Sequence, residues 1–170
     1  MAKITESDIE ELAIDLLEAK GYQYLYGPDI APDSENPLRE SFDEVVLKSK
    51  LESAIDRINP NIPIAARQDA LKQILRTSSP ETVSANEEFH KMLTKGVNVT
   101  YQKDGVERGD LVWLVDFEEI ENNEFLVVNQ FTVSQNHQNK RPDVILFING
   151  LPLVVIELKN AADENATIKS

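Results

Sequence analysis

The sequence predicts an α/β fold in which a mixed central β-sheet is flanked by helices. Apolar residues recur at helical spacing up to residue 95, and short β-branched runs follow from residue 97 onward. The last two runs are apolar at every position, a pattern typical of strands covered on both faces. With 170 residues, of which 41% are hydrophobic, the chain is long enough to bury a core, and we expect one domain over residues 1–170.

Helical periodicity predicts a first helix over residues 6–20, capped by Thr5 or Ser7. A helical segment follows at about 38–95, with helices expected over 38–58, 63–76 and 84–95. Another helix begins near residue 161 and is cut off at Ser170, so we expect the chain to be a fragment of a longer protein.

Five later runs have the composition of strands. They cover residues 97–101, 111–115, 125–128, 144–148 and 153–156. A further short strand is expected over 22–26. Trp113 lies within the second of the five runs, so we expect it in the core.

The charge balance excludes several classes of protein. There are 17 Lys+Arg against 30 Asp+Glu, a net charge of −13, which is unfavourable for a free-standing nucleic-acid binder. Cysteine is absent, which excludes disulfides, thiolate zinc sites and cysteine nucleophiles. No apolar run is long enough for a membrane span and the start does not resemble a signal peptide, so we expect a cytoplasmic protein without membrane contact.

The most informative stretch joins Asp143, at the start of one apolar strand, to Glu157 and Lys159, at the end of the next. Glu157 and Lys159 share a face because side chains alternate along a strand. A two-residue Asn149-Gly150 turn would pair Asp143 with Ile156. An odd-length loop or a bulge would instead pair Asp143 with Glu157, with Cβ atoms about 4.5–5.5 Å apart, and this is the register we expect.

Two carboxylates with open coordination positions suit Mg²⁺. Such an ion lowers the pKa of bound water and neutralises charge on a phosphate under attack, while a lysine on the same face can stabilise developing charge. This is the chemistry of phosphodiester hydrolysis. The same three residues could also form a salt-bridge cluster at the end of the sheet, since the spacing alone is a weak motif.

The stretch Arg141-Pro-Asp-Val-Ile-Leu-Phe-Ile-Asn-Gly-Leu-Pro-Leu-Val-Val-Ile-Glu-Leu-Lys-Asn160 closely resembles the N-terminal nuclease domain of the restriction (R) subunit of type I restriction-modification enzymes. Phe89-His-Lys-Met-Leu93, Glu107-Arg-Gly-Asp-Leu111 and Asn129-Gln-Phe-Thr-Val133 are similar to that family as well. The resemblance runs from about residue 84 to the end, and more loosely back to the first helix.

This resemblance implies a restriction-endonuclease-like PD-(D/E)xK fold and an Mg²⁺-dependent nuclease. Asp143 and Glu157 match the metal-binding carboxylates, Lys159 matches the catalytic lysine, and the Leu158 carbonyl would be a further metal ligand. An acidic residue of the first helix often joins such sites, and Glu11 or Glu10 is the nearest candidate here. Gln130 ends the strand that precedes the motif, and in such a fold a neighbouring strand could bring Gln130 near the metal.

The resemblance also implies partners. The family cuts duplex DNA nonspecifically after ATP-driven translocation by C-terminal lobes, in complex with methyltransferase (M) and specificity (S) subunits. The lobes, their ATP-binding motif and a Gln-x-x-x-Tyr motif after the lysine strand are not found in these 170 residues. Lys140, Arg141 and His137 are the candidates for DNA contact near the site.

Two other functions stay open. The chain could be a stand-alone repair or recombination nuclease of the same fold. It could also be a non-catalytic docking module whose Asp143, Glu157 and Lys159 form an ion-pair network, which would bind no divalent metal.

Overall fold

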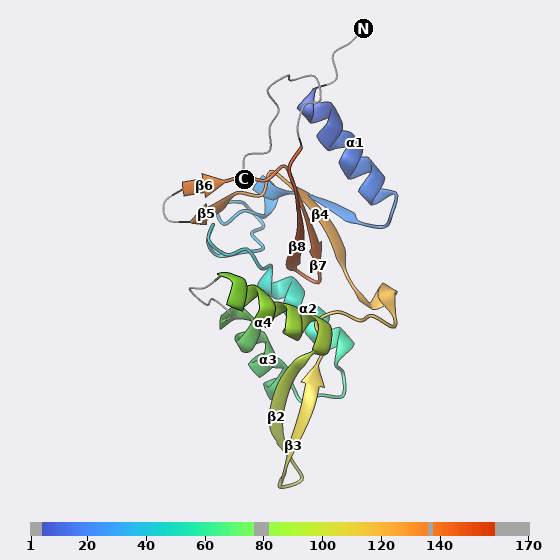
Figure 1. Ribbon diagram of the computed structural model, residues 1–170, viewed down its shortest axis with the longest axis vertical. Helices are drawn as coiled ribbons and strands as arrows, with labels where there is room; N and C mark the ends of the chain where they lie inside the picture. Colours follow the sequence, from blue (N-terminus) through green and yellow to red (C-terminus); the bar gives the residue numbers. More distant parts are fainter. Residues whose placement is uncertain (1–4, 77–81, 136–137, 159–170) are drawn as a thin grey trace. The chain divides into compact units, whose positions relative to one another are not determined.

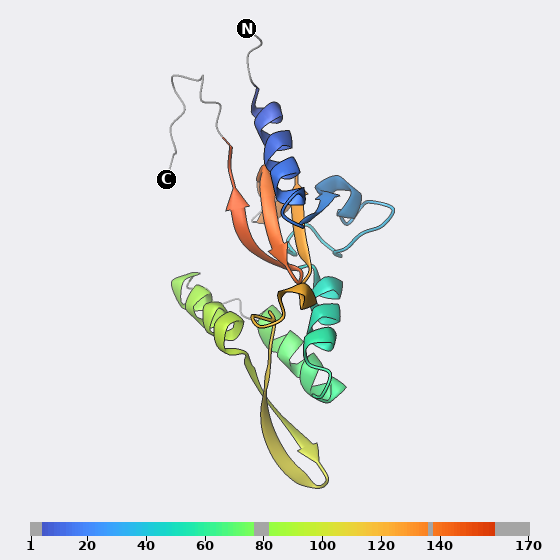
Figure 2. The same ribbon diagram turned by 90° about the vertical axis from the view of Figure 1, so that its right-hand side faces the viewer.

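The computed structural model describes residues 5–76, 82–135 and 138–158. It divides into two compact units (Figures 1 and 2). Unit 1 comprises residues 1–45, 125–148 and 152–170, and unit 2 comprises residues 46–124 and 149–151. The helix expected from residue 161 lies outside the described residues. None of the described helices is long and apolar enough to cross a membrane.

Unit 1 begins with helix α1 (Glu6–Glu18), close to the predicted bounds. Of the two predicted caps, Thr5 is the one used: its hydroxyl accepts the Asp8 N–H at 3.2 Å, and the Asp8 carboxylate accepts the Thr5 N–H at 2.7 Å. This reciprocal capping box satisfies two helix donors. Hydrogen bonds from Thr5, its side chain foremost, hold the pKa of Asp8 below the ordinary value.

A mixed four-stranded sheet forms the centre of unit 1, as predicted, in the order β1 (Gln23–Tyr26), β4 (Phe125–Asn129), β7 (Val144–Ile148), β8 (Leu151–Ile156). Strand β1 runs parallel to β4, and β4 runs antiparallel to β7. The α1 side chains Ile14 and Leu17 pack on Val127, Val144 and Leu146, which places α1 over one face of the sheet (Figure 1).

The connection between β7 and β8 is the two-residue turn Asn149-Gly150, and both residues have positive φ, 52° and 80°. This is the geometry of a type I′ hairpin turn, so the expected odd-length loop was wrong. An unbroken ladder from that turn would place Ile156 opposite Asp143, on the face away from Val144. Ile156 instead packs with the cluster that contains Val144, the relation that a bulge in β8 would produce.

Strand β8 was also expected to be covered on both faces, and this expectation was wrong. Val154 and Val155 are 45% and 58% exposed. Strand β7 is buried over Val144–Phe147, in agreement with its apolar sequence. Within the described sheet β8 is the last strand, and an edge position leaves its middle residues in solvent.

Residues 38–47 are not helical, which corrects the helix expected over 38–58: helix α2 spans Lys48–Ile58 only. The reason is the buried Arg39, whose guanidinium donates to the carbonyls of Glu44 and Thr132 at 3.2 and 2.6 Å. It also lies 3.8 Å from the centroid of the Phe131 ring. The Glu44 carbonyl therefore accepts a hydrogen bond from Arg39. Burial lowers the pKa of the Arg39 guanidinium.

In unit 2, α2 packs on α3 (Ile64–Arg76), which was predicted. Leu51, Ala54 and Ile55 of α2 are buried, as are Ala66 and Ala70 of α3.

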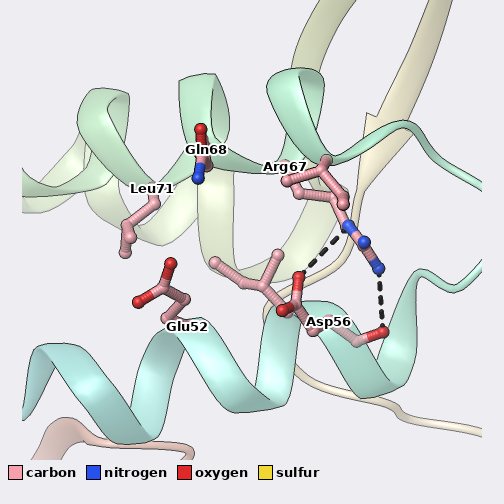
Figure 3. Close-up of a pocket in the computed structure, with 7 residues that line it drawn as sticks. Glu52, Asp56, Arg67, Gln68 and Leu71 are labelled. Atoms are coloured by element: carbon pink, nitrogen blue, oxygen red, sulfur yellow. Dashed lines mark hydrogen bonds and ion pairs between the residues drawn. The ribbon is translucent and has the colours of Figure 1, made fainter.

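Figure 3 shows Arg67 of α3 reaching α2. Its Nη1 donates to the Asp56 carbonyl at 3.1 Å, and its Nε lies 3.2 Å from the Asp56 carboxylate. This contact ties the two helices together at the carboxyl end of α2.

The remainder of unit 2 is helix α4 (Thr82–Lys95), the 3-10 helix η2 (Ile120–Asn122) and a hairpin of β2 (Val97–Lys103) with β3 (Val106–Val112). The strand expected over 111–115 therefore ends at Val112. Beyond it, the Trp113 N–H and carbonyl pair with the side-chain amide of Asn59 rather than with a strand, each at 2.8 Å. Trp113 is 38% exposed, which corrects its expected place in the core.

Unit 1 also contains the 3-10 helix η1 (Gly27–Ile30) and a small hairpin of β5 (Val133–Gln135) with β6 (Gln138–Lys140).

Candidate functional site

Asp143 lies directly before β7 and is half-buried. Its Oδ2 accepts the Leu158 N–H at 2.6 Å, and its carbonyl accepts the Gln130 N–H at 3.3 Å. The first bond holds the residues that follow β8 against the start of β7. The second joins the end of β4 to the same point, so three strand ends meet at Asp143.

Glu157 is exposed and Leu158 is half-buried, both just past the end of β8. Because the Leu158 N–H contacts the Asp143 carboxylate, the structure brings two of the predicted metal-binding segments together. Lys159 and His137 lie outside the described residues. Lys140 and Arg141 are exposed at the end of β6 and just after it.

A carboxylate of α1 approaches the same strand ends. Glu10 Oε1 accepts the Asn129 side-chain amide at 2.7 Å. The Gln130 amide lies 3.3 Å from both Glu10 oxygens. Tyr24 in turn donates its hydroxyl to Asn129 Oδ1 at 2.9 Å, which orients that amide so that its N–H₂ faces Glu10. Four hydrogen bonds thus hold Glu10 and its partners in one arrangement.

Gln130 connects this network to Asp143, since its backbone N–H donates to the Asp143 carbonyl while its side-chain amide donates to the Glu10 carboxylate. Gln130 has φ of 54°, in the left-handed region that non-glycine residues rarely adopt. Close packing against Gly27 supports this conformation: a Cβ at Gly27 would lie 2.5 Å from the Asn129 carbonyl oxygen and 2.7 Å from Gln130 backbone atoms.

Glu11, the other candidate of α1, is exposed. With Glu10 it lines a surface hollow of about 340 Å³. The other residues that line this hollow are Ser7, Ile14, Asp15, Glu18, Tyr24 and Asn129. Burial foremost raises the pKa of the Tyr24 hydroxyl, which stays a neutral donor at physiological pH. Four carboxylates around one hollow repel phosphate unless cations neutralise them.

Among residues 5–76, 82–135 and 138–158, no three or more Asp, Glu or His side chains form a group that could hold a metal ion. The oxygens of Asp143, Glu157 and Glu10 are nevertheless the ligand type that Mg²⁺ prefers, and Mg²⁺ keeps several waters with one or two protein carboxylates. The donor chemistry therefore fits Mg²⁺ without requiring a three-carboxylate cage.

Sequence reasoning considered Glu10 and Gln130 but missed Tyr24 and Asn129. The available signal was the polar pair Asn129-Gln130 directly after the apolar β4 residues, because a polar pair at the end of a buried strand needs partners. Tyr24 carried no signal, since a tyrosine in a short strand is ordinary.

The profile of a protein family described as "Type I restriction enzyme R protein N terminus" matches residues 3–170. The chain belongs to this family. The resemblance drawn from residues 141–160 is thereby confirmed over nearly the whole chain.

Two proteins similar to this chain have names that agree with this family. The chain is 37% identical over 166 residues to the "Type I restriction enzyme HindI endonuclease subunit" of Haemophilus influenzae. It is 34% identical over 163 residues to the "Putative type I restriction enzyme MjaIXP endonuclease subunit" of Methanocaldococcus jannaschii. These matches cover 97% and 94% of this chain but 16% of each relative.

Proposed function

We propose that this chain is the Mg²⁺-dependent endonuclease domain of a type I restriction enzyme R subunit, with a PD-(D/E)xK fold. Family membership and the printed names of the relatives, which are endonuclease subunits, support an R-subunit domain. The observation that carries the catalytic part is the 2.6 Å contact between Asp143 and the Leu158 N–H. It brings the two halves of the predicted motif to one end of the sheet.

In this proposal Asp143, Glu157 and the Leu158 carbonyl hold Mg²⁺. Of the two α1 candidates we assign Glu10, in place of Glu11, as the carboxylate beside these metal ligands, because its partner Gln130 also bonds to Asp143. A bound Mg²⁺ would activate water and neutralise charge on the scissile phosphate. Lys159 stabilises the charge that develops on that phosphate.

DNA contact is assigned to Lys140, Arg141 and His137. The net charge of −13 is unfavourable for holding DNA by this chain alone. We therefore assign the main grip on duplex DNA to ATP-driven translocase lobes elsewhere in the longer protein and to M and S subunits. Cleavage is then nonspecific in sequence and follows translocation, in the cytoplasm.

The test uses the intact R subunit assembled with its M and S partners and carrying Lys159→Ala. Plasmid cleavage and ATP hydrolysis are followed in the same reaction. We expect cleavage to fall by at least about a hundredfold, as for loss of a transition-state donor, with ATP hydrolysis unchanged. Lys103→Ala, at an exposed position of β2, is the matched control. Cleavage by Lys159→Ala at the rate of the control would refute the assignment.

A second measurement separates the nuclease from a docking module. Calorimetric titration of the 170-residue chain with Mg²⁺ should show binding that Asp143→Ala abolishes. An ion-pair cluster predicts no Mg²⁺ binding by either protein. If the wild-type chain binds no Mg²⁺ even at millimolar concentration, the proposed metal ligands are wrong.

A further inference from the structure

A loop of unit 2 exposes large apolar side chains that the nuclease proposal does not use. Trp113, Phe117 and Ile120 are 38%, 61% and 62% exposed. Residues 113–121, called here the 113–121 loop, also carry four carboxylates. These are Asp116, Glu118, Glu119 and Glu121. Exposed aromatic residues grouped on one loop are uncommon on surfaces that contact only water.

The start of the loop is fixed by a buried amide. Asn59 accepts the Trp113 N–H and donates to the Trp113 carbonyl, both at 2.8 Å, and it also donates to the Ile55 carbonyl at 2.9 Å. The Trp113 backbone is therefore held like a residue in a strand pair, while its ring remains accessible.

The middle of the loop is fixed by Asp116. Its Oδ1 accepts the N–H groups of Glu118 and Glu119 at 3.0 and 2.9 Å, and its Oδ2 accepts the Asn122 side-chain amide at 2.9 Å. Asn123 bonds to both the N–H and the carbonyl of Asp116, at 2.9 and 2.7 Å. Phe117 is thus exposed by a hydrogen-bonded turn that is already formed, which lowers the entropy lost on binding.

The loop borders a hollow of about 420 Å³. Its lining combines apolar and acidic side chains: Ile58, Thr94, Trp113, Val115, Asp116, Phe117 and Glu118. Such a hollow is large enough for one or two apolar side chains of a partner. The hydrogen bonds to Asp116, that from Asn122 foremost, lower the pKa of its carboxyl, so the Asp116 carboxylate stays charged near neutral pH.

We propose that the 113–121 loop is a docking site for a partner protein segment that inserts a large apolar side chain flanked by Lys or Arg. Charge decides the occupant. Four carboxylates within six positions attract a basic segment and repel DNA phosphate. A second copy of this chain, with its net charge of −13, is repelled as well. Trp113 and Phe117 are the side chains expected to carry most of the binding energy, as aromatic residues do at the centres of interfaces.

The test exploits Trp113, the single tryptophan of the 170 residues, whose fluorescence reports binding at the loop. The probe is a synthetic helical peptide with leucine on one face and lysine on the other. Its control has the same lysines with serine in place of leucine. We expect the leucine peptide to shift Trp113 emission with saturation, and the serine peptide to bind at least about tenfold more weakly.

Two pairs of variants make the test specific. Phe117→Ser should weaken binding of the leucine peptide at least about tenfold, whereas Val106→Ser, at an equally exposed apolar residue of β3, should change it less than about twofold. Glu118→Gln with Glu119→Gln should weaken binding more than Glu35→Gln with Glu107→Gln, which removes the same charge from exposed positions elsewhere.

The proposal is overturned if both peptides bind alike, or if the members of each variant pair behave alike. Either result would mean that lysine is attracted by the overall negative charge rather than by the loop. Phe117→Leu, which keeps an apolar side chain at this position, should restore most of the affinity lost in Phe117→Ser. None of these outcomes depends on cleavage activity, so the result stands or falls apart from the nuclease proposal.

Discussion

Gly27→Ala tests whether the Asn129–Gln130 segment is held by close packing. A Cβ at position 27 would lie 2.5 Å from the Asn129 carbonyl oxygen, where ordinary contact begins at 3.4 Å, so the backbone has to move by the difference, about 0.9 Å. Backbone shifts forced by one added carbon cost about 1–3 kcal/mol. For a chain of this size, 2 kcal/mol lowers Tm by about 4–8 °C. Thermal unfolding followed by circular dichroism measures this change.

Gly109→Ala is the matched control, because its nearest atom to an added Cβ is 4.0 Å away and its φ is not positive. We expect it to be neutral or to stabilise the protein by up to about 1 kcal/mol. Equal Tm values for Gly27→Ala and the wild type would refute the reasoning, since the strand end would then be free to adjust. In the intact R subunit, Gly27→Ala should also reduce cleavage, because the displaced residues hold Glu10.

Three further predictions follow from the described contacts. Arg39→Ala should lower the free energy of unfolding by about 2–4 kcal/mol, measured with urea, because two carbonyls lose a charged donor; the exposed Arg108→Ala should change it by less than about 0.5 kcal/mol. Because the pKa of Asp116 is lowered in the folded state, its carboxylate stabilises the fold at pH values above the ordinary carboxyl pKa, and this stabilisation is lost as pH falls through the pKa of the folded state. The Tm of Asp116→Asn should therefore fall less than the Tm of the wild type between pH 5 and 2. Parallel Tm curves for the two proteins would contradict this prediction. Asn129→Asp places a second carboxylate where an amide now donates to Glu10 at 2.7 Å, and the two like charges repel each other. Cleavage by the intact enzyme should therefore fall at a fixed Mg²⁺ concentration and recover in part as the Mg²⁺ concentration is raised. An unchanged Mg²⁺ dependence would argue against a metal role for Glu10.

The sequence predicted the elements whose pattern is local. Helix α1, strand β7 and helix α3 lie within a few residues of their expected bounds, since their periodicity and end signals are contained in the segments themselves. The failure over residues 38–47 has a nonlocal cause. The buried Arg39 donates to the Thr132 carbonyl, 93 positions away in the chain, and no window around residue 39 contains that information.

In the candidate site, too, the local features could be predicted from the sequence and the long-range ones could not. Asp143 and the segment around Leu158 could be predicted to meet because they flank one hairpin. The choice between Glu10 and Glu11 could not be made from α1, where both are ordinary acidic residues of a polar face. It depends on Asn129, 119 positions away, and on the left-handed backbone of Gln130, which no sequence pattern indicated.

The Asn149-Gly150 turn has a consequence for how the gene can change. The Leu47 N–H donates to the Gly150 carbonyl at 2.9 Å. Glu124 exchanges two bonds with Asn149, one from its N–H to the side-chain oxygen at 2.8 Å and one from the Asn149 N–H to its carbonyl at 2.9 Å. One dipeptide thus bonds to both Leu47 and Glu124, and so holds the two ends of the segment 46–124 together. Insertions at an exposed turn between those ends, such as Asp104-Gly105 of the β2–β3 hairpin, lengthen a segment whose ends are already held together, which costs little in chain entropy. Evolution can therefore lengthen this segment at such turns without disturbing the contacts of Leu47 and Glu124 with the dipeptide.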